Sequence, residues 1–247
     1  MNNTRRIQAF IGTMMLAAAG TAAYVGMLSH ALHGYFALAV LALAAATSRM
    51  KVKLPGINGN MSVNLPFLLT AVVNLSAAEA ILITCVSTGV QCWPRKNAKV
   101  NSQQMAFNIG MMTFASCLAS LMFHGGTLHS WAWMSFAWKS TPVSLALATL
   151  TLFLGQTVPV AAIIALSEGK AVGPLWGSMA QLSFPYYVLS AGISSMVETV
   201  SAHMGWQLAL AVFPVMYAIH RSYRLYFAKT AETQPANALV RAASAGA

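Results

Sequence analysis

The sequence predicts an all-α fold, a polytopic transmembrane helical bundle, and two observations carry that prediction. First, 57% of the 247 residues are hydrophobic and only 7% are charged, whereas about 25% are charged in an ordinary soluble domain. So few charges cannot cover the surface of a soluble protein of this size. Second, several uninterrupted apolar runs reach the roughly 20 residues that a helix needs to cross the hydrocarbon core. A membrane β-barrel would instead alternate polar and apolar residues.

Eight apolar runs define the expected helices in chain order. They lie at residues 7–28, 31–48, 65–75, 77–93, 104–123, 142–166, 178–199 and 205–221. The first run exceeds the 7–15 residues of a signal-peptide core, so we expect an uncleaved first span. Together the runs predict one integral membrane domain over residues 1–229 with about eight spans. The small, polar residues 230–247 predict a disordered cytoplasmic tail.

The basic residues indicate the orientation of the helices. There are fourteen Lys and Arg residues against four acidic ones, and aspartate is absent. They stand in short groups between the apolar runs, which marks topology rather than a nucleic-acid partner. With eight crossings, Lys139 falls on one face, and the following groups fall on the other: Arg5 and Arg6; Arg49, Lys51 and Lys53; Arg95, Lys96 and Lys99; Lys170; Arg221, Arg224 and Lys229. We therefore expect both termini in the cytoplasm and the lipid bilayer of a bacterial inner membrane as the surrounding partner.

The third run is too short for an ordinary span. As an α-helix, residues 65–75 would rise only about 16 Å, roughly half the hydrocarbon thickness. They form either a short or re-entrant half-span inside the bundle, or a helix that begins earlier, within residues 60–64. A single span over 65–93 would place two basic groups on opposite faces. Ser76 lies three residues before Glu79, which is the capping-box spacing and favours a new helix near residue 77.

Polar side chains within the apolar runs are candidates for ligand binding. Asn74, Asn108 and Gln156 are the amides of this kind. Pro159 follows Gln156 and should free a backbone carbonyl one turn earlier, beside that amide. The alternative is that Asn108 and Gln156 only join helices by hydrogen bonds.

The segment SFPYYVLSAG places Pro185 within the seventh run, with Tyr186 and Tyr187 beside it. A proline-kinked helix with adjacent tyrosines can line a pocket, and we expect both tyrosines to face a ligand. A kink with tyrosines that only fill the core is the alternative.

The sequence offers little for metal binding or catalysis. His124, His129 and His203 lie near the expected outer ends of helices, but no HExxH or His-x3-His pattern occurs, and we expect no metal and no cofactor. The chain has no P-loop, no aspartate for a triad or a two-metal site, and no GxSxG. The three cysteines lack CxxC spacing and are expected to be free thiols. We therefore expect no enzyme.

Four motifs together resemble the N-terminal membrane modules of bacterial HD-GYP and GGDEF proteins, which handle cyclic di-GMP. The resemblance covers about residues 40–230. Its motifs are a P-G-x-x-G-x-x-S turn, an LS-x-x-E turn, an F-N pair and an R-x-Y-R-x-Y exit: Pro55, Gly56, Gly59 and Ser62; Ser76 and Glu79; Phe107 and Asn108; Arg221, Tyr223, Arg224 and Tyr226.

The resemblance implies a sensory input module that binds a ligand and passes a signal through its last helix. Arg221, Tyr223 and Arg224 would form the exit of that signal. The chain ends shortly after Tyr226, so the output is expected from a separate cytoplasmic signalling protein, and a homodimer fits such a module. The alternative function is the substrate-binding subunit of a small-molecule transporter, since residues 65–89 are similar to the substrate-binding subunits of energy-coupling-factor vitamin transporters.

Overall fold

The computed structural model describes residues 3–28, 32–53, 60–94, 101–124, 141–204 and 212–226. The predicted turn residues Pro55, Gly56 and Gly59, the candidate His129 and the expected tail lie outside these ranges. The described helices are α1 (Asn3–Leu28), α2 (Gly34–Ser48), α3 (Leu65–Asn74), α4 (Ala77–Cys92), α5 (Ser102–His124), α7 (Thr141–Glu168), α8 (Val172–Met204) and a helix over 212–226. Each overlaps one expected run, so the predicted helical fold is confirmed.

The polar segment after α2 contains a small sheet that the sequence analysis did not predict. Strands β1 (Lys51–Lys53) and β2 (Asn60–Ser62) pair antiparallel, with Val52 opposite Met61. Three residues are too few to show the period-2 alternation by which a strand is recognised. The hydroxyl of Ser62 donates to the carbonyl of Ser48 at 3.1 Å, which ties the hairpin to the end of α2.

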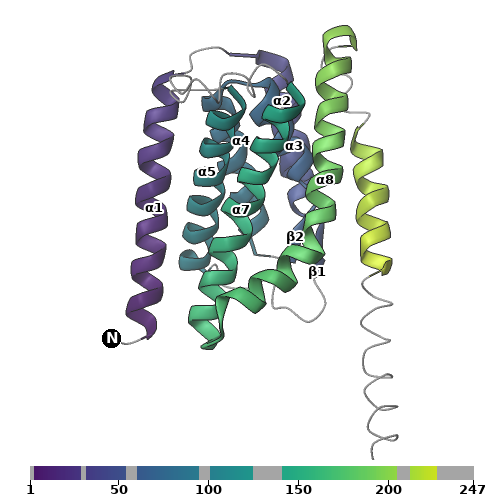
Figure 1. Ribbon diagram of the computed structural model, residues 1–247. Helices are drawn as coiled ribbons and strands as arrows, with labels where there is room; N and C mark the ends of the chain where they lie inside the picture. The colour runs from purple at the N-terminus through teal and green to yellow at the C-terminus, as the bar shows by residue number, and fades with distance from the viewer. Residues whose placement is uncertain are drawn as a thin grey trace, which may run out of the picture.

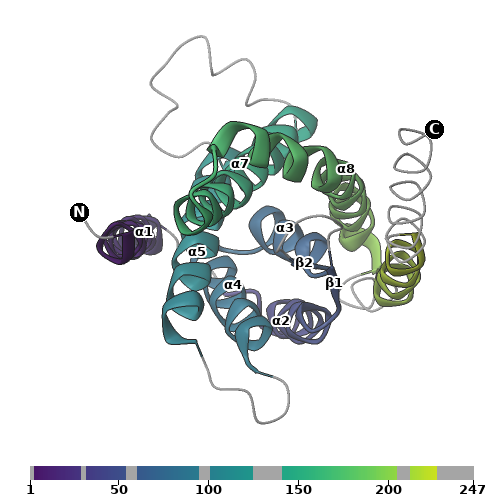
Figure 2. The ribbon, with the colours of Figure 1, turned by 90° about the horizontal axis from the view of Figure 1, so that it is seen from below.

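The short helix α3 lies at the centre of the bundle. Figure 2 shows it inside a ring formed by α2, α4, α5, α7 and α8, with α1 outside the ring against α5. All of its residues from Leu65 to Val73 are buried. Ten residues rise only about 15 Å. The structure therefore has the short internal helix, and residues 60–62 form β2 rather than an earlier helical turn.

The predicted capping box separates α3 from α4. The Glu79 N–H donates to Ser76 Oγ at 3.3 Å, and the Ser76 N–H donates to Glu79 Oε2 at 3.0 Å. Glu79 also reaches the start of α2, where Oε1 accepts from the His33 N–H at 2.7 Å and Oε2 lies 2.8 Å from His33 Nδ1. One buried carboxylate thus joins the α3–α4 turn to α2.

Three of the described helices are long and apolar enough to cross a membrane, namely α1, α5 and α7. The apolar helices α2, α3 and α4 are shorter. Fifteen or sixteen residues extend only about 22–24 Å, against about 30 Å of hydrocarbon. The membrane character is therefore supported, while the count of about eight spans and the cytoplasmic termini stay predictions.

Several segments that carry basic residues lie at one end of the bundle, the lower end in Figure 1. The start of α1 with Arg5, the end of α2 with Arg49, β1 with Lys51, and the α7–α8 turn with Lys170 all lie there. A hydrogen bond of 2.8 Å from Asn3 Nδ2 to the carbonyl of Leu166 joins the first and third of the long helices at this end. We call it the basic end below.

Candidate ligand-binding cavity

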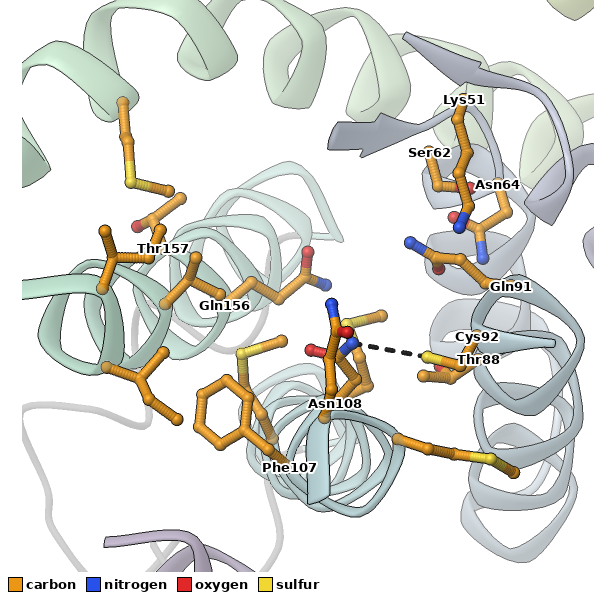
Figure 3. A pocket seen from close by; sticks show the side chains of 18 of the residues that line it. Lys51, Ser62, Asn64, Thr88, Gln91, Cys92, Phe107, Asn108, Gln156 and Thr157 are labelled. Atoms are coloured by element: carbon orange, nitrogen blue, oxygen red, sulfur yellow. Dashed lines mark hydrogen bonds between the residues drawn. The ribbon is translucent and has the colours of Figure 1, made fainter. Parts of the chain in front are cut away.

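A cavity of about 710 Å³ lies between α3, α4, α5, α7 and α8. This volume is within the usual range for small-molecule sites. Its polar lining, part of which Figure 3 shows, consists of Lys51, Ser62, Asn64, Thr88, Gln91, Cys92, Asn101, Gln103, Gln104, Asn108, Gln156, Thr157, Ser167, Ser183, Tyr186 and Tyr187. Among the described residues, no acidic side chain lines the cavity.

Gln156 of α7 is held in the cavity wall by a tyrosine of α8. The hydroxyl of Tyr187 donates to Gln156 Oε1. This bond leaves the buried Gln156 Nε2 without a hydrogen-bond partner among the described residues. The Tyr187 ring is fixed in turn by an edge-to-face contact with Phe153, with centroids 5.1 Å apart. The amide is therefore oriented and retains donors for a bound molecule.

Asn64 supplies a second unused amide. It stands at the N-cap position of α3, where asparagine commonly bonds the first backbone N–H groups, yet its side chain makes no such bond. The residue is only 3% exposed, and its Nδ2 has no partner among the described residues. Thr88 of α4 is 1% exposed, and its hydroxyl also has no hydrogen-bond partner among the described residues. Each buried polar group left unbonded costs about 1–3 kcal/mol.

Asn108 of α5 lies between these groups. Its Nδ2 donates to the sulfur of Cys92 at 3.3 Å, and sulfur is a weak acceptor. In Figure 3 the side chains of Gln156, Gln91 and Lys51 extend into the space beside Asn108 from different elements. The described part of the site thus combines several amides with one lysine.

The structure places four of the five predicted ligand-facing residues in this cavity: Asn108, Gln156, Tyr186 and Tyr187. Their binding of a ligand stays a prediction. Asn74 lies elsewhere, at the end of α3, where its amide donates to the carbonyl of Thr70 at 3.3 Å. An amide at a helix end can bond its own last turn, and the sequence-based expectation for Asn74 did not take this into account.

Sequence reasoning missed several lining residues. Thr88, Gln91 and Cys92 stand three and four residues apart on α4, so they share one face of the helix. A polar stripe at this spacing on an otherwise apolar helix is the signal that could have identified them. Lys51 carried no such signal, because only the fold places its strand and α4 at the same cavity.

The predicted signal exit contacts the cavity wall through a pair of aromatic rings. Tyr223, in the 212–226 helix, packs edge-to-face against Tyr186 with centroids 6.1 Å apart. Figure 1 shows α8 bent along its length, with the 212–226 helix beside its upright part, and Pro185 lies inside α8. Arg221 and Arg224 are exposed in the second half of the 212–226 helix.

The metal candidates do not form a cluster that the structure describes. His124 Nε2 lies 2.9 Å from the carbonyl of Val72, so this ring nitrogen is engaged by backbone. His129 and the side chain of His203 lie outside the description. Within the described ranges, no group of three or more His, Cys, Asp or Glu side chains could hold a metal ion.

Comparisons with protein-family models, with curated proteins and with solved structures find no match for this chain. The function must therefore be argued from the cavity itself. Its oriented amides, buried hydroxyls and apolar lining residues suit the reversible binding of a small molecule.

Proposed function

We propose that this protein is an integral membrane module that binds a small molecule and acts as a sensor. The unbonded polar groups of Asn64, Thr88 and Gln156, all lining one cavity, are the observation that carries the proposal. Folded proteins satisfy nearly all buried polar groups. A bound molecule would satisfy these groups, and this supports a ligand rather than a purely structural role.

The proposed location is a bacterial inner membrane, with the basic end in the cytoplasm and about eight crossings. The positive-inside rule supports this orientation, because the start of α1, the end of α2, β1 and the α7–α8 turn carry basic residues and lie at one end. The short helix α3 would be one of the crossings, shielded from lipid by the surrounding ring.

The signal would leave the module through the 212–226 helix. Tyr186 and Tyr187 are neighbours on α8, and Tyr187 bonds Gln156 in the cavity while Tyr186 contacts Tyr223. A ligand that moves this part of α8 would therefore move the 212–226 helix as well. A separate cytoplasmic partner would read the displacement, as the resemblance to cyclic di-GMP signalling proteins implies.

Binding can be tested with the purified protein in lipid nanodiscs, screened by thermal shift against a metabolite library. For every ligand found, we expect Gln156→Ala to weaken binding about fivefold, because one hydrogen bond contributes about 1 kcal/mol. Asn108→Leu should weaken it similarly. Gln181→Ala is the control, since Gln181 is an exposed glutamine of α8 outside the cavity.

The proposal fails if the wild type shows no ligand-dependent shift. It also fails if the shifts persist unchanged in Gln156→Ala and Asn108→Leu.

A transporter subunit is the second candidate, and the position of α3 favours it. Short helices enclosed at the centre of a bundle, with polar groups at their ends, line the substrate sites of many carriers. Uptake of a bound ligand into proteoliposomes would favour the carrier. Binding without uptake would favour the sensor.

A further inference from the structure

We infer that the occupant of this cavity is a small organic anion that enters from the basic end of the bundle, with Lys51 as its counter-charge. The inference rests on the proposed ligand-binding function and adds to it a substrate class and a side of entry. Three observations carry it: where the cavity opens, which charges line it, and what lines its interior.

Among the described residues that line the cavity, the exposed ones belong to the basic end, and we take this as the side on which the cavity opens. They are Lys51 in β1, Asn101 just before α5, Gln103 and Gln104 in the first turn of α5, and Ser167 at the end of α7. β1, the start of α5 and the end of α7 all lie at the lower end of Figure 1. None of the described residues at the opposite end, such as His33 and His124, lines the cavity.

The lining offers hydrogen-bond donors and positive charge. The amide nitrogens of Asn64 and Gln156 are unbonded donors within the described chain, and an ammonium group such as that of Lys51 has three donors and no acceptor. Figure 3 shows Lys51 extending toward Asn64 and Gln91. An occupant rich in acceptor oxygens, such as a carboxylate or a phosphate ester, matches this surplus of donors.

Lys51 differs from Lys170 at the same end of the bundle. Lys170 pairs with Glu168, with Nζ and Oε2 2.7 Å apart. No ion pair of Lys51 is found among the described residues, and no described acid lines the cavity beside it. A positive charge in a cleft whose walls exclude water attracts an anion more strongly than the same charge on an open surface.

The interior of the cavity indicates an organic rather than an inorganic anion. Leu68 of α3 and the methionines Met111 and Met112 of α5 line it. Their side chains form an apolar surface on which a hydrocarbon body can pack, and methionine adapts to irregular shapes. An inorganic ion would leave this surface empty.

Cys92 provides a reporter inside the site. It lines the cavity on α4, is half-buried and is a free thiol. We would prepare a variant that retains only Cys92, by Cys85→Ala and Cys117→Ala, and measure its alkylation by a membrane-impermeant maleimide. Inside-out and right-side-out vesicles of the expressing bacterium present opposite faces to the reagent. A variant that retains only Cys85 is the control, because Cys85 is half-buried but does not line the cavity.

The probes are matched pairs of an anion and a neutral analogue: hexanoate and hexanamide, benzoate and benzamide, glutarate and glutaramide, and phenyl phosphate and phenol. We expect alkylation of Cys92 in inside-out vesicles only, and slower alkylation in the presence of at least one anion but not of its partner. Lys51→Gln should raise the protecting concentration about tenfold, as expected for loss of a charge-assisted hydrogen bond. Lys170→Gln, which removes the same charge outside the cavity, should not.

Alkylation from the opposite face overturns the inferred side of entry. Three outcomes overturn the inferred substrate class. They are equal protection of Cys92 by an anion and its neutral partner, no effect of Lys51→Gln on the protecting concentration, and no protection by any anion. If a neutral ligand still raises the melting temperature of the wild type but not that of Gln156→Ala, the proposed function stands. In that case only the inference that the occupant is an anion is wrong. Should the single-cysteine variants not fold, mass spectrometry of the alkylated wild type reports on Cys92 directly.

Discussion

At the scale of single residues, Glu79 illustrates how one buried carboxylate can hold three segments. It accepts backbone hydrogen bonds from His33 and Ser76 and is only 7% exposed. The first turn of α4 adds the favourable field of a helix N-terminus to these bonds. Removing its charge while keeping its shape isolates the electrostatic part of this arrangement.

We expect Glu79→Gln to lower the free energy of unfolding by about 1–3 kcal/mol, because a neutral amide has one acceptor oxygen in place of two charged ones. Thermal unfolding in detergent would measure the loss. Glu168→Gln is the matched control, since Glu168 belongs to an exposed ion pair, and such a pair contributes below about 1 kcal/mol. Equal losses in the two variants would contradict the special role of Glu79.

At the scale of secondary-structure elements, the contact between α5 and α7 depends on a glycine. A Cβ added at Gly155 would lie 2.8 Å from Ala115 Cβ and 3.2 Å from Ala115 Cα. Small residues at such positions let helices approach closely, which is a common source of stability between helices in membranes. The close contact also positions Gln156, the next residue, in the cavity wall.

We expect Gly155→Ala to destabilise the protein by about 1–3 kcal/mol, since the added methyl group would force the two helices apart. Gly177→Ala in α8 is the control. Nothing lies within 4 Å of a Cβ built there, so the higher helix propensity of alanine should make that variant neutral or up to about 1 kcal/mol more stable. Melting temperatures of the two variants that shift in the same direction would contradict close packing at Gly155.

At the scale of the whole molecule, the positions of the helix ends predict the membrane topology. Fusions of a cytoplasm-active and a periplasm-active reporter after Lys51, after Lys170 and after Arg224 should all report the cytoplasm, because basic residues beside membrane spans stay on that side. Fusions after His33 and His124 should report the periplasm. Opposite sides for Lys51 and Lys170 would contradict both the orientation and the side of ligand entry.

The limits of sequence reasoning follow from what each signal measures. Apolar runs locate helices because burial in lipid or in a core demands continuous hydrophobicity. They locate ends less well: α8 begins at Val172 rather than 178, since its first turns are less apolar.

The end of α7 is set by the local geometry at Gly169. This glycine has a left-handed φ of +66°, and the next N–H, that of Lys170, donates to the carbonyl of Ala165.

By itself, the sequence determined the helical class, the approximate helices, the capping box at Ser76 and Glu79, and several cavity residues, because hydrophobicity and capping act between near neighbours in the chain. Only the tertiary structure decided that α3 lies inside a ring of helices, that Asn64 and Lys51 line the same cavity as α4, and that the exposed lining residues lie at the basic end. These features depend on which helix faces pack together. That choice is made by shape and by hydrogen bonds between residues far apart in the chain, and no local pattern records it.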